Sequence, residues 1–204
     1  MDRNQNGQQL MFKPLFNYLE LFQKIPLPDK KIVCQNVKYK KVREGEILLE
    51  EGGLAREMFF ICKGVLKIVS INQKGNEVIH FFLMENQFCT ILKSFNENIK
   101  SGDRIQAACD AELIIFQKDK LHSLYNALPY FKNLLDNITK QALLDKIELR
   151  NAYLGEDAKT RYQKFIVRQS SIALRVSQTD IASYLGITKQ SLSRIRRNIP
   201  QIAF

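Results

Sequence analysis

The residues whose types and spacing could do chemistry lie between positions 176 and 199. If residues 189–197 form a helix, Leu192 and Ile195 share the face that turns inward. Polar and basic side chains then remain on the outer face, namely Lys189, Gln190, Ser191, Arg194 and Arg197. Arginine, lysine and glutamine donate hydrogen bonds to base edges and phosphates. This stretch therefore predicts contact with DNA.

Two short helices joined by a tight turn would position these side chains. Ser177 and Asp180 have the spacing of a capping box at the start of a first helix. Gly186 suits the turn because a residue without Cβ adopts a left-handed conformation at little cost. Thr188 is placed to cap the second helix. The apolar face of the first helix would carry Ile181, Ala182 and Leu185, and the whole pattern predicts a helix-turn-helix.

The positive charge of the chain is concentrated in this region. From Lys159 onward there are nine lysines and arginines against one acid, Asp180, which is +8 of the formal +10 of the whole chain. An ordinary helical hairpin with a soluble surface usually mixes the two signs. A local positive field on the segment with recognition-helix spacing favours DNA over that alternative.

Composition argues against several other classes of protein. The chain is 45% hydrophobic and 25% charged, which is ordinary for a globular protein. No apolar run approaches the roughly 20 residues of a membrane span, and residues 1–9 lack the apolar stretch of a signal peptide, so we expect a cytoplasmic protein without membrane contact. Four dispersed cysteines and two distant histidines predict no metal, no cofactor and no hydrolase triad. A cupin-type enzyme would need a His-x-His cluster, which is missing.

The region between residues 37 and 116 has the pattern of β-structure. Short runs rich in β-branched and aromatic residues alternate with Gly, Asn and charged turns about every ten residues. This spacing predicts a compact antiparallel barrel or sandwich. The apolar residues of 12–22 follow helical spacing and predict a short helix packed on it.

A long helix is expected after the strands, with residues 118–128 and 129–149 both helical. Its apolar residues advance in alternating steps of four and three. They could pack on the same domain or pair with a second copy of the chain. Leu134, Leu143, Leu144 and Ile147 widen the apolar surface, so that both contacts can occur at once. We favour the second use and expect a homodimer seam at Phe131, Leu135, Ile138 and Ala142. Gly155 and its neighbours then break the helix as a hinge.

Together these segments resemble the cyclic AMP receptor protein and fumarate-nitrate regulator (Crp/Fnr) family of bacterial transcription factors. The resemblance is carried by residues 44–48, 59–64 and 75–78, and above all by residues 181–188 with 191–195. It implies an α+β fold with a cyclic-nucleotide-binding-like antiparallel β-roll at 1–128. A dimerisation helix and hinge would follow at 129–154, and a C-terminal winged helix-turn-helix at 155–204. Because only residues 200–204 follow the second helix, we expect the wing around 170–175.

The same resemblance divides the DNA contacts into two kinds. The family's base-contacting positions fall on Lys189, Gln190 and Arg194, whose side chains suit guanine and adenine edges. The residues placed for phosphates are Ser177, Gln178, Thr179, Thr188, Ser191, Arg196 and Arg197. Contacts of the first kind would give specificity, and those of the second kind affinity.

The sensor departs from the family where cyclic nucleotides bind. Thr90 stands at the position of the phosphate-admitting glycine, and Ile91 at that of the ribose-binding glutamate. Ser101 lies near the place of the phosphate-binding arginine, with Arg104 close by. These four residues are the candidate effector pocket. A buried phosphate without an arginine is costly, so we expect an unknown effector and no physiological cyclic AMP binding.

The sequence therefore predicts a sequence-specific DNA-binding transcription regulator, not an enzyme. It would act as a homodimer on a two-fold symmetric operator, with duplex DNA, RNA polymerase and an unknown small-molecule effector as partners. The alternative is a small-molecule-binding regulatory module whose basic helical tail binds a protein partner. Activator and repressor are not distinguished by these residues.

Overall fold

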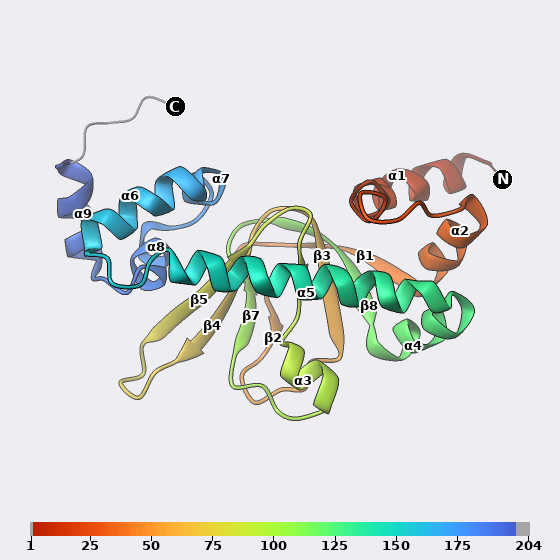
Figure 1. Ribbon diagram of the computed structural model, residues 1–204, viewed down its shortest axis with the longest axis horizontal. Helices are drawn as coiled ribbons and strands as arrows, with labels where there is room; N and C mark the ends of the chain where they lie inside the picture. The colour runs from red at the N-terminus through yellow and green to blue at the C-terminus, as the bar shows by residue number, and fades with distance from the viewer. Residues whose placement is uncertain (1, 199–204) are drawn as a thin grey trace.

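The computed structural model describes residues 2–198 as two antiparallel β-sheets with helices on both sides (Figure 1). The sequence between residues 37 and 117 alternates strand-forming runs with turns, and it folds accordingly. The strands are β1 (Val37–Val42), β2 (Ile47–Leu49), β3 (Glu57–Lys63), β4 (Leu66–Ile71), β5 (Glu77–Leu83), β6 (Phe88–Cys89), β7 (Arg104–Ala107) and β8 (Ala111–Gln117).

Each sheet has four strands. The first has the order β1-β8-β3-β6 and the second the order β2-β7-β4-β5. All neighbouring strands are antiparallel. The predicted antiparallel β-roll is confirmed, and β5 lies at one edge of the second sheet.

The strands bury one face in the core between the two sheets, and part of the other face under helices. Phe59 and Ile61 of β3 lie in the core between the sheets, together with Ile68 and Ile105 of the second sheet. Successive residues of a strand point to opposite faces, so Phe60 lies on the outer side of the first sheet. The run 58–61 of β3 is thereby buried on both faces, whereas β1 and β5 keep exposed residues such as Lys40 and His80.

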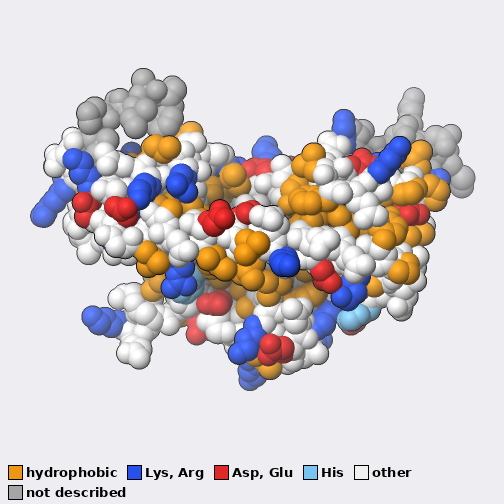
Figure 2. Space-filling model, in the orientation of Figure 1, with side chains coloured by type: hydrophobic (Ala, Val, Ile, Leu, Met, Phe, Trp, Pro, Cys, Tyr) orange, Lys and Arg blue, Asp and Glu red, His pale blue; other side chains and the backbone are white. Residues whose placement is uncertain are grey.

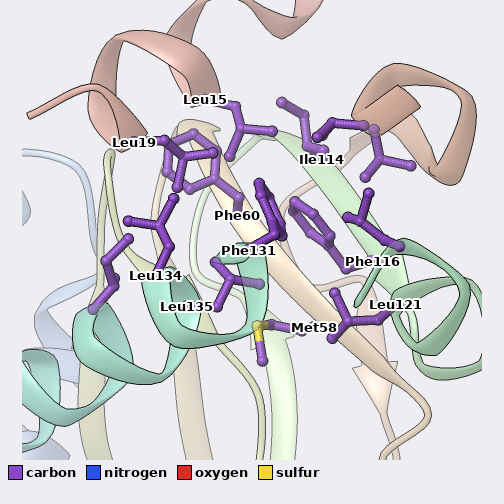
Figure 3. Close-up of a cluster of buried hydrophobic side chains, with 14 of the residues drawn as sticks. Leu15, Leu19, Met58, Phe60, Ile114, Phe116, Leu121, Phe131, Leu134 and Leu135 are labelled. Atoms are coloured by element: carbon purple, nitrogen blue, oxygen red, sulfur yellow. The ribbon is translucent and has the colours of Figure 1, made fainter. Parts of the chain in front are cut away.

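Helices cover this outer face of the first sheet (Figure 3). Leu15 and Leu19 pack over Phe60 from one side, while Phe131 approaches from the other. The helix expected at 12–22 is longer than predicted, and a second helix was not predicted. The covering helices are α1 (Asp2–Leu19), α2 (Leu27–Asn36), α4 (Lys118–Ala127) and α5 (Pro129–Asn151), while α3 (Leu92–Glu97) lies between β6 and β7.

The structure corrects the predicted dimer seam on α5. Phe131, Leu135 and Ile138 are only 0–2% exposed and belong to the core of their own subunit. The first half of α5 lies against the first sheet and α4, and its apolar side chains are buried in that contact. Ala142 is half-buried beside the β-roll. The exposed apolar residues of α5 are Leu143, Leu144 and Ile147, each 46–49% exposed.

The C-terminal helices pack against β4 and β5, at one side of the second sheet. They are α6 (Ala158–Arg168), α7 (Ser170–Ala173), α8 (Gln178–Tyr184) and α9 (Lys189–Arg197). Their buried residues form one cluster with Val69, Ile79 and Phe82 of the second sheet. The two sheets therefore lie between the helices that cover the first sheet and the C-terminal helices.

The wing expected around residues 170–175 is not formed there. This stretch contains α7, because Ile172 is needed in the core of the helical cluster. Between β8 and Asn198 the described chain contains no strand. Residues 199–204, which include the short segment expected after the second helix, lie outside the described residues.

Candidate nucleic-acid interface

The predicted helix-turn-helix forms as its caps indicate. Ser177 Oγ accepts a hydrogen bond from the Asp180 amide at 3.0 Å, and Thr188 Oγ1 accepts one from the Ser191 amide at 3.1 Å. Gly186 joins the helices with a φ of +65°, a conformation that favours glycine. The local sequence thus decides where α8 and α9 begin.

The two faces of α9 differ in burial as predicted. Leu192 is fully buried and Ile195 half-buried against the rest of the helical cluster. Lys189, Gln190 and Arg194 are exposed. At about 100° per residue these three lie within an arc of about 140°. Figure 1 shows α9 at the end of the molecule farthest from α1, so the three side chains can approach a partner together.

The predicted phosphate-binding residues lie at the start of α8 and along α9. Gln178, Thr179, Arg196 and Arg197 are exposed, and so are Ser177 and Thr188. The hydroxyls of Ser177 and Thr188 serve as helix caps, and Thr188 also donates to Ser191 Oγ at 3.0 Å. These three hydroxyls therefore already take part in hydrogen bonds at the helix starts.

The basic side chains of α9 are not neutralised within the subunit. Within residues 2–198, none of Lys189, Arg194, Arg196 and Arg197 forms a salt bridge. Blue side chains are visible at the helical end of the molecule in Figure 2, next to red ones. Such a surface retains its full attraction for phosphate.

The one acid that follows Lys159, Asp180, docks α8 on the β-roll. Asp180 Oδ1 pairs with Lys67 Nζ of β4 at 2.9 Å, and the two side chains are only 15% and 11% exposed. A buried pair loses several kcal/mol when one partner is removed, since the other charge stays desolvated. The pair also removes the acid from the vicinity of the basic face.

Ser183 joins α8 to the edge of the second sheet. Its hydroxyl donates to the carbonyl of Glu77 at 2.8 Å and accepts from the amide of Ile79 at 3.2 Å. Edge strands otherwise expose unpaired backbone groups. The Ser183 hydroxyl thus satisfies two backbone groups on the free edge of β5, as a neighbouring strand would.

Two further contacts complete the docking. Arg175 makes a bidentate ion pair with Glu85, whose carboxylate also accepts from the Gly64 amide at 2.7 Å. Burial opposes ionisation of Glu85, but Arg175 and the amide outweigh it and lower its pKa. The rings of Phe82 and Tyr184 lie 5.1 Å apart, so apolar packing and ion pairs hold the same joint.

The four residues of the candidate effector pocket make separate local contacts. Thr90 donates to the Glu57 carbonyl and lines a cavity of only about 30 Å³, whereas Ser101 bonds to the Asp103 backbone. Arg104 pairs with Glu77 across the sheet instead of facing a phosphate. Ile91 is half-buried at the start of α3. A cavity of that size holds about one water molecule.

Another cavity, of about 700 Å³, opens beside the β-roll near the start of α4. Its lining includes Leu48, Ile105, Arg56, Glu57 and Asp119. The volume is within the range of small-molecule sites. Because its charged residues carry both signs, it does not favour a ligand of either charge.

The described residues offer few groups for metal binding or for nucleophilic catalysis. No group of three or more His, Cys, Asp or Glu side chains is placed there to hold a metal ion. All four cysteines are free, and burial raises the pKa of Cys62 and of Cys89 to about 12. These thiols stay protonated near neutral pH and are poor nucleophiles. None of the described helices has the length and apolar character to cross a membrane.

The residues that dock the helix-turn-helix on the β-roll were not predicted from the sequence. Lys67 and Asp180 are separated by 113 positions, Ser183 and Ile79 by 104, and Arg175 and Glu85 by 90. In the sequence, Lys67, Glu85 and Arg175 look like ordinary surface residues, and Ile79 takes part through its backbone amide. The local sequence carries no signal for such pairs.

Comparisons with known proteins agree with this architecture. Residues 39–127 match the family described as the cyclic nucleotide-binding domain. The chain is 21% identical over 168 residues to the transcriptional activator protein Anr of Pseudomonas aeruginosa, a match that covers 76% of this chain and 68% of Anr.

Solved structures share the fold over most of its length. A putative transcriptional regulator of the Crp/Fnr family from Eubacterium rectale has a TM-score of 0.68 at 19% identity, covering 89% of this chain and 86% of that one. FixK2 of Bradyrhizobium japonicum has a TM-score of 0.66 at 17% identity, covering 79% and 83%. The c-di-GMP responsive global regulator CLP of Xanthomonas campestris has a TM-score of 0.65 at 12% identity, covering 84% and 90%.

The docking of α8 gives a first prediction. Asp180→Asn should lower the free energy of unfolding by about 2–4 kcal/mol, because it leaves the Lys67 ammonium buried without its partner. Chemical denaturation measures this difference. Asp136→Asn is the control, since its pair with Lys132 is 57–58% exposed and should contribute less than about 1 kcal/mol. Equal effects of the two variants would contradict the docking role.

Proposed function

We propose that this chain, which belongs to the Crp/Fnr family, regulates transcription by binding DNA as a homodimer. The observation that carries the proposal is the outward, unneutralised basic face of α9 on a capped helix-turn-helix. A helix of this kind inserts into the major groove, where base edges distinguish all four base pairs. The proposed partners are duplex DNA and RNA polymerase.

The roles of the individual side chains follow from their positions. Lys189, Gln190 and Arg194 are proposed to contact base edges, because they share the exposed face of α9. The residues proposed to contact phosphates are Ser177, Gln178, Thr179, Thr188, Ser191, Arg196 and Arg197. Their contacts would fix the register of the protein on the duplex without reading its sequence.

The dimer is proposed to form along the second half of α5. Leu143, Leu144 and Ile147 fall within an arc of about 100° on that helix, on a face different from that of the buried Leu135 and Ile138. Figure 2 shows hydrophobic side chains along the front of the molecule, where α5 lies in Figure 1. An apolar stripe of this kind is typical of a helix that pairs with its own copy.

Residues 1–128, 129–154 and 155–204 are proposed as sensor, dimerisation helix with hinge, and DNA-binding domain. The core contacts of Phe131 and Ile138 tie the start of the dimerisation helix to the sensor. A change in the sensor could thereby be transmitted to the dimer and to the reading helices. The sensor is proposed to respond to an effector other than cyclic AMP.

For DNA binding, Arg194→Ala should weaken binding to the preferred duplex by about 1–3 kcal/mol, since it removes a base contact. The preferred sequence comes from selection of bound fragments, and fluorescence anisotropy measures affinity. Arg197→Ala should weaken all duplexes alike and reduce the salt slope by about 1, as loss of a phosphate contact does. Lys132→Ala, on exposed α5 surface, is the control. Unchanged specificity in Arg194→Ala would refute the assignment of α9.

For the dimer, Ile147→Glu should raise the dissociation constant on the order of 100-fold or more, because it buries an unpaired charge at the interface. Sedimentation equilibrium measures the association. Gln141→Glu places the same charge on another exposed face of α5 and should leave the dimer intact. A wild-type chain that stays monomeric at tens of micromolar would count against the proposal.

For the sensor, calorimetry with cyclic AMP should give no binding heat at micromolar concentrations. The Thr90 hydroxyl is bonded to the Glu57 carbonyl, the cavity beside it holds about 30 Å³, and Arg104 is engaged by Glu77. Lys146 is the one cation that lines this cavity, but a space of about 30 Å³ does not admit a nucleotide phosphate with its sugar, and the phosphate would have to be desolvated at a cost. Saturable micromolar binding would overturn this expectation.

A further inference from the structure

The cavity of about 700 Å³ beside the β-roll takes no part in the proposed DNA and dimer contacts. Its walls come from β2, β7, the start of β3, the end of β8, the first turn of α4 and the residue that ends α3. Figure 1 shows α3 and α4 far from the C-terminal helices. Among the described residues, none of α5 and none of the four candidate effector-pocket residues lines this cavity. It is therefore a separate site from the one that the sequence suggested.

The inner wall of the cavity is apolar. Phe59 and Ile105 line it, and both belong to the core between the two sheets. Leu48, which is half-buried, and Leu54, which is 38% exposed, extend this apolar lining toward the solvent. An apolar group of a ligand would be withdrawn from water against these side chains.

Charged side chains of both signs line the same cavity. Arg56 and Lys120 are basic, while Glu57 and Asp119 are acidic. In the described part of the chain, none of these four forms a salt bridge. The Glu57 carboxylate accepts only a long hydrogen bond, of 3.4 Å, from Gln117 Nε2. The hollow thus keeps opposite charges apart and leaves them available to a ligand.

The walls are joined to one another by hydrogen bonds that need no ligand. The Lys118 amide donates to the Arg56 carbonyl at 2.9 Å, and Lys118 Nζ donates to Asn98 Oδ1 at 2.9 Å. The Ala55 amide donates to the buried Ser94 Oγ at 2.9 Å. The start of α4, the end of α3 and the loop before β3 are thereby fixed around the cavity, which lowers the cost of ordering them on binding.

A ligand with a single kind of charge would suit only half of this lining. A phosphate ester would face the carboxylates of Glu57 and Asp119, and a simple amine would face two cations, and like charges brought together are unfavourable. A zwitterion suits both halves. Its carboxylate can accept from Arg56 and Lys120 while its ammonium donates to the two acids, and such charge-assisted hydrogen bonds are the strong ones.

We infer that this cavity binds a free α-amino acid with a large apolar side chain. The ammonium and carboxylate meet the four charged residues, and the side chain lies against Phe59 and Ile105. The volume is within the range of small-molecule sites. The ligand would touch α4, whose Leu121 and Leu124 pack in one cluster with Phe131 of α5. A role as the effector of the sensor rests on the proposed function, whereas binding itself does not.

Isothermal calorimetry on the full chain with L-phenylalanine tests the site. Two analogues lack one charge each, since 3-phenylpropanoate has no ammonium and 2-phenylethylamine has no carboxylate. Glycine lacks the side chain. We expect saturable binding of one phenylalanine per chain. Each of the other three compounds should bind about tenfold more weakly or worse, because it loses a charge-assisted hydrogen bond or apolar burial.

Two double variants separate the two kinds of charge. Glu57→Gln with Asp119→Asn should weaken phenylalanine about tenfold or more and should not weaken 3-phenylpropanoate, which has no ammonium to lose. Arg56→Gln with Lys120→Gln should weaken phenylalanine to a similar extent and should not weaken 2-phenylethylamine. A variant that only disturbed the fold would weaken every compound alike.

Lys93→Gln with Glu97→Gln is the matched control. Both residues are exposed on α3, carry opposite charges and do not line the cavity. Phenylalanine affinity should stay within about twofold, as for ordinary surface substitutions. Thermal melts establish that each variant folds. Should a double variant fail to fold, the comparison of phenylalanine with its analogues on the unaltered chain carries the test.

Three outcomes would overturn the inference. They are absence of saturable phenylalanine binding, binding of a single-charge analogue as tight as that of phenylalanine, and equal weakening by the control variant. Duplex binding is measured separately by anisotropy. A chain that binds phenylalanine but no DNA would refute the proposed function and leave the site standing, and a chain that binds DNA but no phenylalanine would refute the site alone.

Discussion

The packing of α8 against β5 is the contact on which the rest of the molecule depends. It joins apolar burial between Phe82 and Tyr184 to the Lys67–Asp180 pair and to the Ser183 hydroxyl on the strand edge. Without it, the outer face of the second sheet would be exposed to water and its edge unpaired. With it, one cluster of side chains completes the β-roll and supports the reading helix.

This arrangement separates two uses of charge. Asp180 is turned inward to Lys67, while the arginines of α9 face outward and form no ion pair with the described residues. Buried pairs contribute to position, and unpaired surface cations attract phosphate. The same segment can therefore be anchored to the sensor on one side and present a positive field on the other.

The long helix shows a comparable division. Its first half is built into the sensor through Phe131 and Ile138, and its second half carries the exposed Leu144 and Ile147 on another face. Near its end, Lys146 turns toward β5 and the helix-turn-helix. One helix thus contributes to the sensor core, carries the proposed dimer contact and lines the cavity of about 320 Å³ beside β5. In the sensor itself, Thr90, Ser101 and Arg104 serve internal bonds.

The sequence by itself determined the elements whose signals are local. The caps at Ser177 and Thr188, the turn at Gly186 and the inward Leu192 define the helix-turn-helix, because helix starts and amphipathic faces depend on residues within a few positions. The strand pattern and the concentration of basic residues could also be recognised from the sequence.

Only the tertiary structure decided which apolar residues of α5 are buried inside the subunit. A helical stripe has the same spacing whether a sheet or a second helix covers it. The wing expected around 170–175, the effector pocket and the docking pairs likewise depended on contacts between distant residues. Lys67 meets Asp180 across 113 positions, and Lys146, Arg150 and Arg161 converge through the fold. Such convergence is a property of the packed layers, since local spacing carries no information about which surfaces meet.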